Sequence, residues 1–308
     1  MQHLFAGLPV RSIAAAPFAP LSLFDGDTAD TLLGVPVFYA PCVAGYVGGD
    51  VTAGLLASGL YRKPGQHLFL DLGTNGEMAL GGAEGFSCCA VASGPAFEGA
   101  GIACGMPALD GAVSRVRYDR GFLYDVIGAS EPRGICGSGL VDLTAALLDL
   151  GAIDRSGRLL PPDETPPSLR RFVRPDGRGN GVFHLTDRVY LTAEDVRSLQ
   201  LAKAAVAGGI EVLLRQRDMD AAALDGVYIA GGFGSYIDPD SAMAIGMLPQ
   251  LPRSKLRCLG NTALAGASMA ALDGEERRRL GRIAANCRYI ELSGRQDFAR
   301  AFTDHMVF

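Results

Sequence analysis

The sequence lacks the patterns that identify a metal centre or a disulfide-bonded protein. Its seven cysteines are odd in number and include no C-x-x-C pair, so neither a disulfide framework nor a zinc ribbon is predicted. The four histidines are scattered along the chain, which argues against a histidine-based metal centre. The cysteines are therefore expected to be buried thiols, with a redox role as the alternative. Cys88 and Cys89 should point to opposite faces of a strand.

Targeting and membrane-spanning segments are missing as well. The first 20 residues have no basic n-region and carry Arg11 within their apolar part, so they do not resemble a signal peptide. Residues 31–49 carry no charge, but two prolines and four glycines interrupt them. A short strand followed by a loop is predicted there rather than a membrane span. We expect a cytoplasmic protein that does not contact a membrane.

Charge is also sparse. Of the 308 residues 20% are charged and the formal net charge is −5, which argues against a broad nucleic-acid-binding surface. The apolar fraction of 48% is enough for a sizeable core. Glycine is abundant, with 41 residues, roughly twice the usual share. Tight turns and close backbone contacts are therefore expected.

Hydrophobic patterning predicts an α/β fold. Short apolar runs joined by glycine turns indicate an antiparallel opening of a sheet, and the later alternation of strands and helices indicates parallel strands with crossover helices. The predicted strands are 36–40, 67–71, 77–80, 86–92, a strand that begins at 226 and runs into glycines by 235, and 255–260. The predicted helices are 44–61, 137–151 with Ser138 as N-cap, 192–216, one that starts at Asp238-Pro239, 261–272, and one that begins at 273.

The helix at 192–216 has the clearest signals. Thr192 and Asp195 have the spacing of a capping box. Gly208 and Gly209 in its middle cost roughly 1 kcal/mol each relative to alanine, so another element is expected to approach them closely. By contrast, residues 155–190 are rich in proline, arginine and glycine and are predicted to be an irregular insertion, with its arginines in a solvated loop.

The stretch "DLGTNGE" (71–77) has the composition of a phosphate-binding turn. Asp71 ends an apolar strand, and the glycines after it allow consecutive backbone N–H groups to face an anion. Thr74 and Asn75 can add side-chain donors. A carboxylate beside a phosphate requires a cation between them, so Asp71 is predicted to hold Mg²⁺, through water. An ordinary β-hairpin is the alternative, because Asn-Gly is a strong hairpin turn.

The order of several motifs resembles the second lobe of the actin-like ATPases, the superfamily of Hsp70, actin and acetate and sugar kinases. More specifically, the chain is similar to the C-terminal region of the reductive activators of corrinoid proteins. The resemblance runs almost end to end and weakens only in the 155–190 insertion. It is carried by "VAGYVGGDVTAGLLASG", "DLGTNGE", "ASGPAFEGAGIACGM", "RGICGSGLVDL", "LAKAAVAGGIEVLL", "YIAGGFGSYIDPDSAMAIGMLP" and "GNTALAGASMAAL".

The resemblance implies ATP and Mg²⁺ as cofactors and a corrinoid protein as partner. Family members couple ATP to the electron transfer that returns a cobalt(II) corrinoid to cobalt(I). In this chain the implied phosphate loop is Asp71, Gly73, Thr74, Asn75 and Gly76, and the implied adenosine motif is Gly231, Gly232, Phe233 and Gly234. Weaker candidates are Lys203 for the base or ribose, the turn at Gly137, Ser138 and Gly139 for a phosphate, and Glu98 as a polar site residue. Lys203 could equally face solvent, and Glu98 could brace a loop.

The chain departs from the family pattern in its first part. Family members also have an iron–sulfur domain and a first lobe with a further "D-x-G-T-T" loop, neither of which occurs here, so no iron–sulfur cluster is expected. Residues 1–62 are expected to be the tail of a first lobe (a helix, the 36–40 strand and a crossing helix), and 63–308 the second lobe. The alternatives are a non-catalytic module that docks on a corrinoid protein and a small-molecule kinase. A homodimer is also plausible, because the lobe tail would otherwise expose apolar surface.

Overall fold

A six-stranded mixed sheet forms the centre of the molecule. The computed structural model describes residues 30–32 and 35–308. The strand order is β13-β12-β3-β4-β5-β14. β3, β4 and β5 form an antiparallel meander, while β12 and β13 run parallel to β3 and β14 runs parallel to β5. The antiparallel opening and the parallel continuation predicted from the sequence are confirmed. The strands are β3 (His67–Leu72), β4 (Gly76–Gly82), β5 (Gly85–Val91), β12 (Gly226–Ala230), β13 (Leu256–Gly260) and β14 (Cys287–Tyr289).

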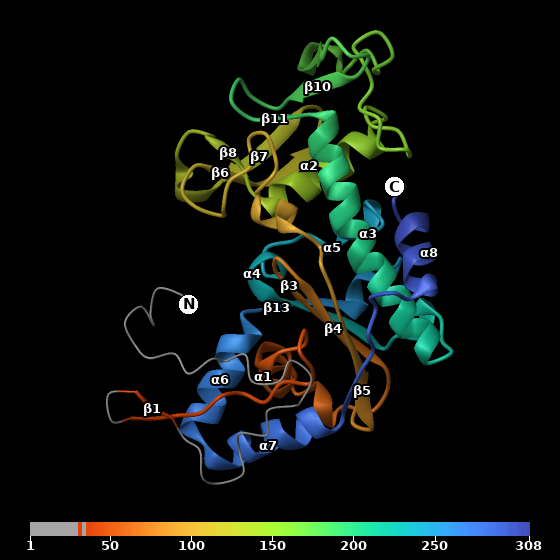
Figure 1. Cartoon of the computed structure of the whole chain (residues 1–308). Coiled ribbons are helices and arrows are strands. Elements are labelled where there is room, and N and C mark those ends of the chain that lie inside the picture. The colour runs from red at the N-terminus through yellow and green to blue at the C-terminus, as the bar shows by residue number, and fades with distance from the viewer. Residues whose placement is uncertain (1–29, 33–34) are drawn as a thin grey trace.

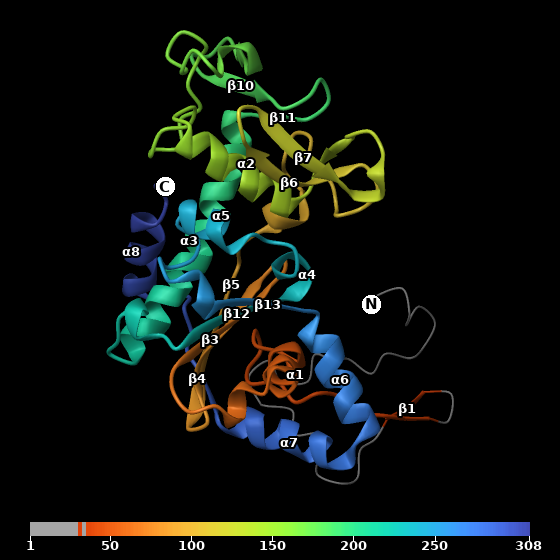
Figure 2. The same ribbon diagram turned by 180° about the vertical axis from the view of Figure 1, so that it is seen from behind.

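Each face of this sheet is covered by a helical layer. Alternation along β3 sends Leu68, Leu70 and Leu72 into the core beneath α3 (Ala193–Gln216) and α8 (Gln296–Asp304), whereas Phe69 enters the opposite core. That second core is closed by α1 (Gly49–Ser58), α6 (Thr262–Leu272) and α7 (Gly274–Ala285). Figures 1 and 2 show the two layers from opposite sides. The arrangement buries β3 on both faces, which explains its nearly continuous apolar run.

Glycines let α1 approach both the sheet and α6. A Cβ atom at Gly54 would lie 2.4 Å from the ring of Phe69, and one at Gly266 would lie 2.0 Å from the carbonyl oxygen of Ala53. No side chain fits in either place. The small-residue composition of both helices is therefore a packing requirement.

The long helix α3 begins as predicted, because Thr192 and Asp195 form both hydrogen bonds of a capping box. Its glycine pair is contacted on two sides. A Cβ at Gly208 would lie 3.1 Å from the backbone nitrogen of Phe302 on α8, and one at Gly209 would lie 2.9 Å from Val91 on β5. The elements that approach the glycine pair closely, as predicted, are therefore α8 and the central sheet.

A second part of the molecule lies beyond one end of the sheet (Figure 1). It contains a small sheet of order β7-β6-β8, the helix α2, and a further antiparallel sheet of order β11-β10-β9. The prediction that 155–190 is irregular was therefore wrong in part. Its strands are only two to four residues long and lie among prolines and glycines, so their pattern is too short to recognise. The elements are β6 (Ala112–Tyr118), β7 (Phe122–Val126), β8 (Gly134–Ile135), α2 (Gly137–Asp149), β9 (Val173–Pro175), β10 (Gly181–His184) and β11 (Tyr190–Leu191).

The remaining predictions concern the two ends of the chain and the cysteines. The 36–40 strand is shorter than predicted and forms a small hairpin of β1 (Asp30–Leu32) and β2 (Val35–Val37); the helix expected before it lies outside the described residues. Cys88 and Cys89 are buried in different cores, as predicted, but Cys258 is exposed, so not all seven thiols are buried. Within the described part of the chain, no helix is long and apolar enough to cross a membrane.

Candidate functional site

The hairpin between β3 and β4 carries the predicted phosphate loop at its tip. Asp71 and Glu77 lie directly opposite each other in the ladder, and Thr74 and Asn75 are exposed between them. The N–H of Gly73 donates to the carbonyl oxygen of Asn75 at 2.9 Å, which closes the turn. Among the described residues no backbone acceptor binds the N–H groups of Thr74 and Asn75. Two backbone N–H groups at this exposed tip are therefore without a backbone partner among the described residues, and an anion can bind them.

A neighbouring loop braces this tip. The hydroxyl of Ser93 donates to the carbonyl oxygen of Thr74 at 3.1 Å, and the hydroxyl of Thr74 donates to Oε1 of Glu98 at 2.5 Å. Glu98 is exposed beside the turn, so it lies at the site and also holds the loop. The bond to Glu98 occupies the Thr74 proton, which leaves the hydroxyl oxygen as an acceptor.

Three carboxylates gather at the base of the hairpin. Burial, and after it the Asp50 carboxylate, raise the pKa of Asp71 to about 6. Burial, Asp50 and Asp71 raise the pKa of Glu77 to about 7. A cation between these groups would relieve their mutual repulsion, so the donor set fits Mg²⁺. No three acidic, histidine or cysteine side chains form a metal-binding group within residues 35–308, so phosphate oxygens and water would have to supply the other ligands.

The glycine-rich turn after β12 lies against this hairpin. In the parallel ladder Ala230 pairs with Asp71, and the chain then enters the short helix α4 (Gly231–Gly234). Gly231 has a φ of +91°, and a Cβ there would lie 2.5 Å from Oδ1 of Asp71, so only glycine fits. Gly232 is exposed, and no atom lies within 4 Å of its Cβ position. The backbone at Gly232 is therefore open to a ligand.

Aromatic stacking joins α4 to the bracing loop. The rings of Phe233 and Phe97 stack with centroids 4.4 Å apart and an angle of 10° between their planes. Phe233 is buried by this contact, so it positions α4 and offers little surface to a ligand. A Cβ at Gly137 would lie 2.0 Å from the carbonyl oxygen of Phe97, which places the start of α2 against the same loop.

Two of the weaker candidates are engaged elsewhere. Cys136, and not Ser138, occupies the N-cap position of α2; the Ser138 hydroxyl donates to the carbonyl oxygen of Ser114 at 2.8 Å. Lys203 is only 1% exposed, and its ammonium donates to the carbonyl oxygen of Val307 and lies 5.2 Å from the Phe308 ring centre. Burial lowers the pKa of Lys203 to about 8. This lysine faces the C-terminal residues and not solvent.

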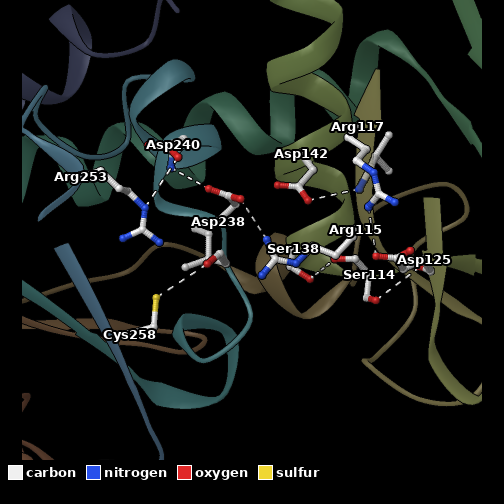
Figure 3. A network of polar contacts seen from close by, with 12 residues as sticks. Ser114, Arg115, Arg117, Asp125, Ser138, Asp142, Asp238, Asp240, Arg253 and Cys258 are labelled. Atoms are coloured by element: carbon white, nitrogen blue, oxygen red, sulfur yellow. Dashed lines mark hydrogen bonds and ion pairs between the residues drawn. The ribbon is translucent and has the colours of Figure 1, made fainter. Parts of the chain in front are cut away.

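A cavity of about 470 Å³ lies between α2, β6 and the start of α5 (Pro239–Ala244). Arg115 on β6 and Asp238 before α5 form an ion pair across it at 3.1 Å (Figure 3). Sequence reasoning missed this ion pair, because the two residues lie 123 positions apart and no local pattern links them. It also missed Glu77 and Asp50. The register of an Asn-Gly hairpin would have paired Glu77 with Thr74, whereas the turn in the structure spans residues 73–75 and pairs Glu77 with Asp71. No local signal gave Asp50 a role at the site.

The comparisons with known proteins agree with the α/β fold. Residues 65–308 match the family model described as the C-terminal domain of RACo, the ASKHA domain, and residues 1–63 match the RACo middle region. A solved reductive activator for a corrinoid, iron-sulfur protein superposes with a TM-score of 0.81 at 37% identity, covering 89% of this chain and 45% of that one.

Two curated relatives are also similar. The corrinoid activation enzyme RamQ of Eubacterium limosum is 35% identical over 325 residues, which cover 100% of this chain and 54% of that protein. The [Co(II) methylated amine-specific corrinoid protein] reductase of Methanosarcina barkeri is 26% identical over 260 residues, 77% of this chain and 44% of the relative. The chain thus spans about half the length of these relatives. Its fold, its motifs and these matches show that it belongs to the family of reductive activators of corrinoid proteins and contains the ASKHA domain of that family.

Proposed function

We propose that this chain is the nucleotide-binding part of an enzyme that uses ATP and Mg²⁺ to return a corrinoid protein from cobalt(II) to cobalt(I). The contact of Gly231 with Asp71 carries the proposal, because it puts the hairpin tip and the glycine turn at one edge of the sheet. In open α/β sheets, ligands bind at the carboxyl ends of the strands. The family membership and the names of the relatives support the corrinoid partner.

Each part of the site has a separate role in this proposal. The free N–H groups of Thr74 and Asn75 bind phosphate oxygens, and the exposed backbone at Gly232 lies along the adenosine. Asp71 and Glu77 are the residues that would hold Mg²⁺, through water, and the cation would supply positive charge beside the transferred phosphoryl group. The electron comes from an iron–sulfur domain outside this chain, and one electron reduces cobalt(II) to cobalt(I).

A single lobe supplies only part of the binding energy. Three or four charge-assisted hydrogen bonds are each worth about 1.5–3 kcal/mol. Association costs on the order of 4–15 kcal/mol, and micromolar affinity requires about −8 kcal/mol net. We therefore propose that residues 1–62 are the tail of a first lobe, and that the rest of that lobe completes the cleft from the other side.

The test is thermal stabilisation of the chain by millimolar Mg-ATP, with and without the first lobe supplied in trans. A shift that grows with the added lobe and disappears in Asp71→Ala is expected. The same mixture with a corrinoid protein and a low-potential reductant should develop the cobalt(I) absorption only when ATP is present. Absence of any nucleotide-dependent shift with both lobes present would refute the proposal.

A second candidate is a non-catalytic module that docks on a corrinoid protein. It is favoured by the exposed apolar side of α6, where Leu264 is 63% and Leu272 is 90% exposed, an unusual arrangement for a helix without a partner. Co-purification of the corrinoid protein that does not change with nucleotide would support this role. Binding that requires Mg-ATP would exclude it.

A further inference from the structure

A second cavity, of about 180 Å³, lies at the edge of the central sheet opposite to the β3–β4 hairpin tip. Its walls are the end of β4, the start of β5, the C-terminal half of α7 and the short turn that follows α1. Figures 1 and 2 show α7 at this end of the sheet and α4 at the other. The cavity shares no lining residue with the hairpin tip, with α4 or with the cavity beside α2. None of the functions considered above uses it.

Only two charged side chains line this cavity, and both are arginines. Arg279 is held by two carboxylates of its own helix, because its guanidinium donates to Oε1 of Glu275 at 2.8 Å and to Oε1 of Glu276. Its Cζ also lies 5.8 Å from the centre of the Tyr61 ring. Arg282, three residues further along α7, is exposed and has no ion-pair partner in the part of the chain that the structure describes. One positive charge of the lining is therefore left without a counter-ion.

The rest of the lining combines one side-chain amide with apolar surface. The backbone of Asn286 is fixed, because its carbonyl oxygen accepts the N–H of Phe86 at 3.0 Å, whereas its side-chain amide has no hydrogen bond to any described residue. Tyr61, Phe86 and Ile283 supply two aromatic rings and an aliphatic side chain. An anion bound by Arg282 would thus lie beside apolar surface. A ligand with an apolar body therefore fits this cavity better than one that is polar on all sides.

The shape of the cavity is fixed by close backbone packing. A Cβ at Gly82 would lie 2.5 Å from the carbonyl oxygen of Gly65, and one at Gly85 would lie 2.7 Å from the carbonyl oxygen of Asn286. The β4–β5 turn is therefore packed against neighbouring backbone at two points. The ion pairs of Arg279 hold its side chain in place as well. A ligand would have to order few further groups, which lowers the entropic cost of binding.

Size and charge together define the class of ligand. A cavity of about 150 Å³ is large enough for benzene, so this one can hold a ring of that size. A single free guanidinium balances one negative charge, and the two oxygens of a carboxylate match its paired N–H groups. Inorganic phosphate carries more than one negative charge at pH 7 and has no apolar surface. It would bring charge for which the lining has no free cation.

We propose that this cavity is a binding site for a small organic monocarboxylate about the size of benzoate, whose carboxylate is bound by the guanidinium of Arg282. The amide of Asn286 donates a further hydrogen bond, and the rings of Tyr61 and Phe86 contact the apolar body. The lining holds no thiol, imidazole, carboxylate or amine that could act as nucleophile or general base, so the site binds its ligand without transforming it. A bound ligand would connect α7 to the β4–β5 turn.

The test measures binding of benzoate to the whole chain by ligand-observed NMR, beside benzamide, which has the same shape without the charge, and inorganic phosphate. We expect benzoate to bind at least tenfold more tightly than either. Arg282→Gln removes the free charge, and Ala83→Leu fills the cavity from the β4–β5 turn without changing any charge. Each should weaken benzoate at least tenfold. The control is Arg278→Gln, an exposed arginine of the same helix outside the lining, which should bind benzoate as the unmodified chain does.

Two results would overturn the inference. One is that benzoate does not bind, or binds Arg282→Gln as tightly as the unmodified chain. The other is that phosphate or benzamide binds the unmodified chain as tightly as benzoate does. Arg282 and Ala83 are both exposed, so their variants should unfold at the temperature of the unmodified chain when no ligand is present. Mg-ATP should stabilise Arg282→Gln as it does the unmodified chain, because the two sites share no residue. Failure of this inference therefore leaves the proposed function intact.

Discussion

Asp71 and Glu77 place two carboxylates across one hairpin, with Asp50 from α1 near both. A protein that needed only stability would gain by replacing one of them, because like charges in a partly buried place repel each other. Their raised pKa values are a cost that a bound cation would remove. At the scale of single residues, this cost and the absence of a Cβ at Gly231 are the two features that distinguish the site from an ordinary sheet edge.

The first prediction concerns Glu77→Gln. The pKa of Glu77 is raised to about 7, so the folded protein holds more protons than the unfolded chain between that pH and the ordinary glutamate pKa of about 4.3. The free energy of unfolding therefore falls as pH rises through this window. Without Mg²⁺, Glu77→Gln should match the unmodified chain at pH 4 and be more stable by about 1 kcal/mol at pH 8, allowing for partial exposure.

Urea denaturation at the two pH values measures this difference. Glu84→Gln, an exposed change in the β4–β5 turn, serves as the matched control. An equal difference in stability at pH 4 and pH 8 would show that titration of Glu77 is not the cause.

The second prediction compares two neighbouring glycines. Gly231→Ala forces a side chain into a φ of +91° and against Asp71, so it should lower the free energy of unfolding by about 1–3 kcal/mol. It should also abolish the stabilisation by Mg-ATP. Gly232→Ala has free space around its Cβ, so it should fold normally and still weaken Mg-ATP by blocking the backbone. Thermal unfolding with and without Mg-ATP distinguishes them. If Gly232→Ala binds Mg-ATP as tightly as the unmodified chain, the adenosine does not lie along this turn.

At the scale of elements, the first turn of α3 connects the two parts of the molecule. Asp195 completes the capping box with Thr192, and its Oδ1 also accepts the N–H of Ala103 at 2.7 Å, in the loop that follows the bracing residues. The same carboxylate therefore starts the helix and holds a loop of the site. This second contact could not be read from the sequence, which predicted only the cap.

The third prediction separates these two roles. Thr192→Ala removes one cap bond and should lower the free energy of unfolding by about 1 kcal/mol. Asp195→Ala removes the other cap bond and also the Ala103 contact from a position that is 2% exposed, so it should cost about 2–3 kcal/mol. Ser198→Ala further along α3 is the control. Equal losses in the two cap variants would mean that the Ala103 contact contributes nothing.

Local signals explain which elements the sequence could predict. The β3–β4 hairpin, the capping box of α3 and the proline at the start of α5 are each encoded within a few residues, and all three occur in the structure, although the hairpin turn is residues 73–75 and not Asn75-Gly76. The short strands of residues 155–190 escaped prediction because two to four residues carry too little pattern. Contacts such as that of Arg115 with Asp238 could not be predicted, because they form only when segments far apart in the sequence come together in the fold. The pairing of β12 with β3 likewise joins segments far apart in the sequence and has no local signal.

At the scale of the whole molecule, the proposed nucleotide site would be completed by a first lobe. The exposed apolar side of α6 and the roughly doubled length of the relatives favour a second wall contributed by the first lobe. The fourth prediction follows. The chain alone should hydrolyse ATP no faster than its Asp71→Ala variant, and addition of the first lobe should restore a rate that depends on Asp71. Hydrolysis by the chain alone that requires Asp71 would show that one lobe suffices.

The position of β3 between β4 and β12 has a consequence for how the protein is made. The β3–β4 hairpin pairs segments that are neighbours in the sequence, so it can form early during synthesis. The glycine turn after β12 reaches the hairpin only after a very long loop has closed. Gln66 and Asp225, which form a hydrogen bond where the pairing of β3 with β12 begins, are 159 residues apart. Closing such a loop is slow. A growing chain on the ribosome would thus contain the hairpin long before the complete nucleotide site had formed. ATP, as a ligand of the complete site, would favour the docking of β12 and its glycine turn beside the hairpin.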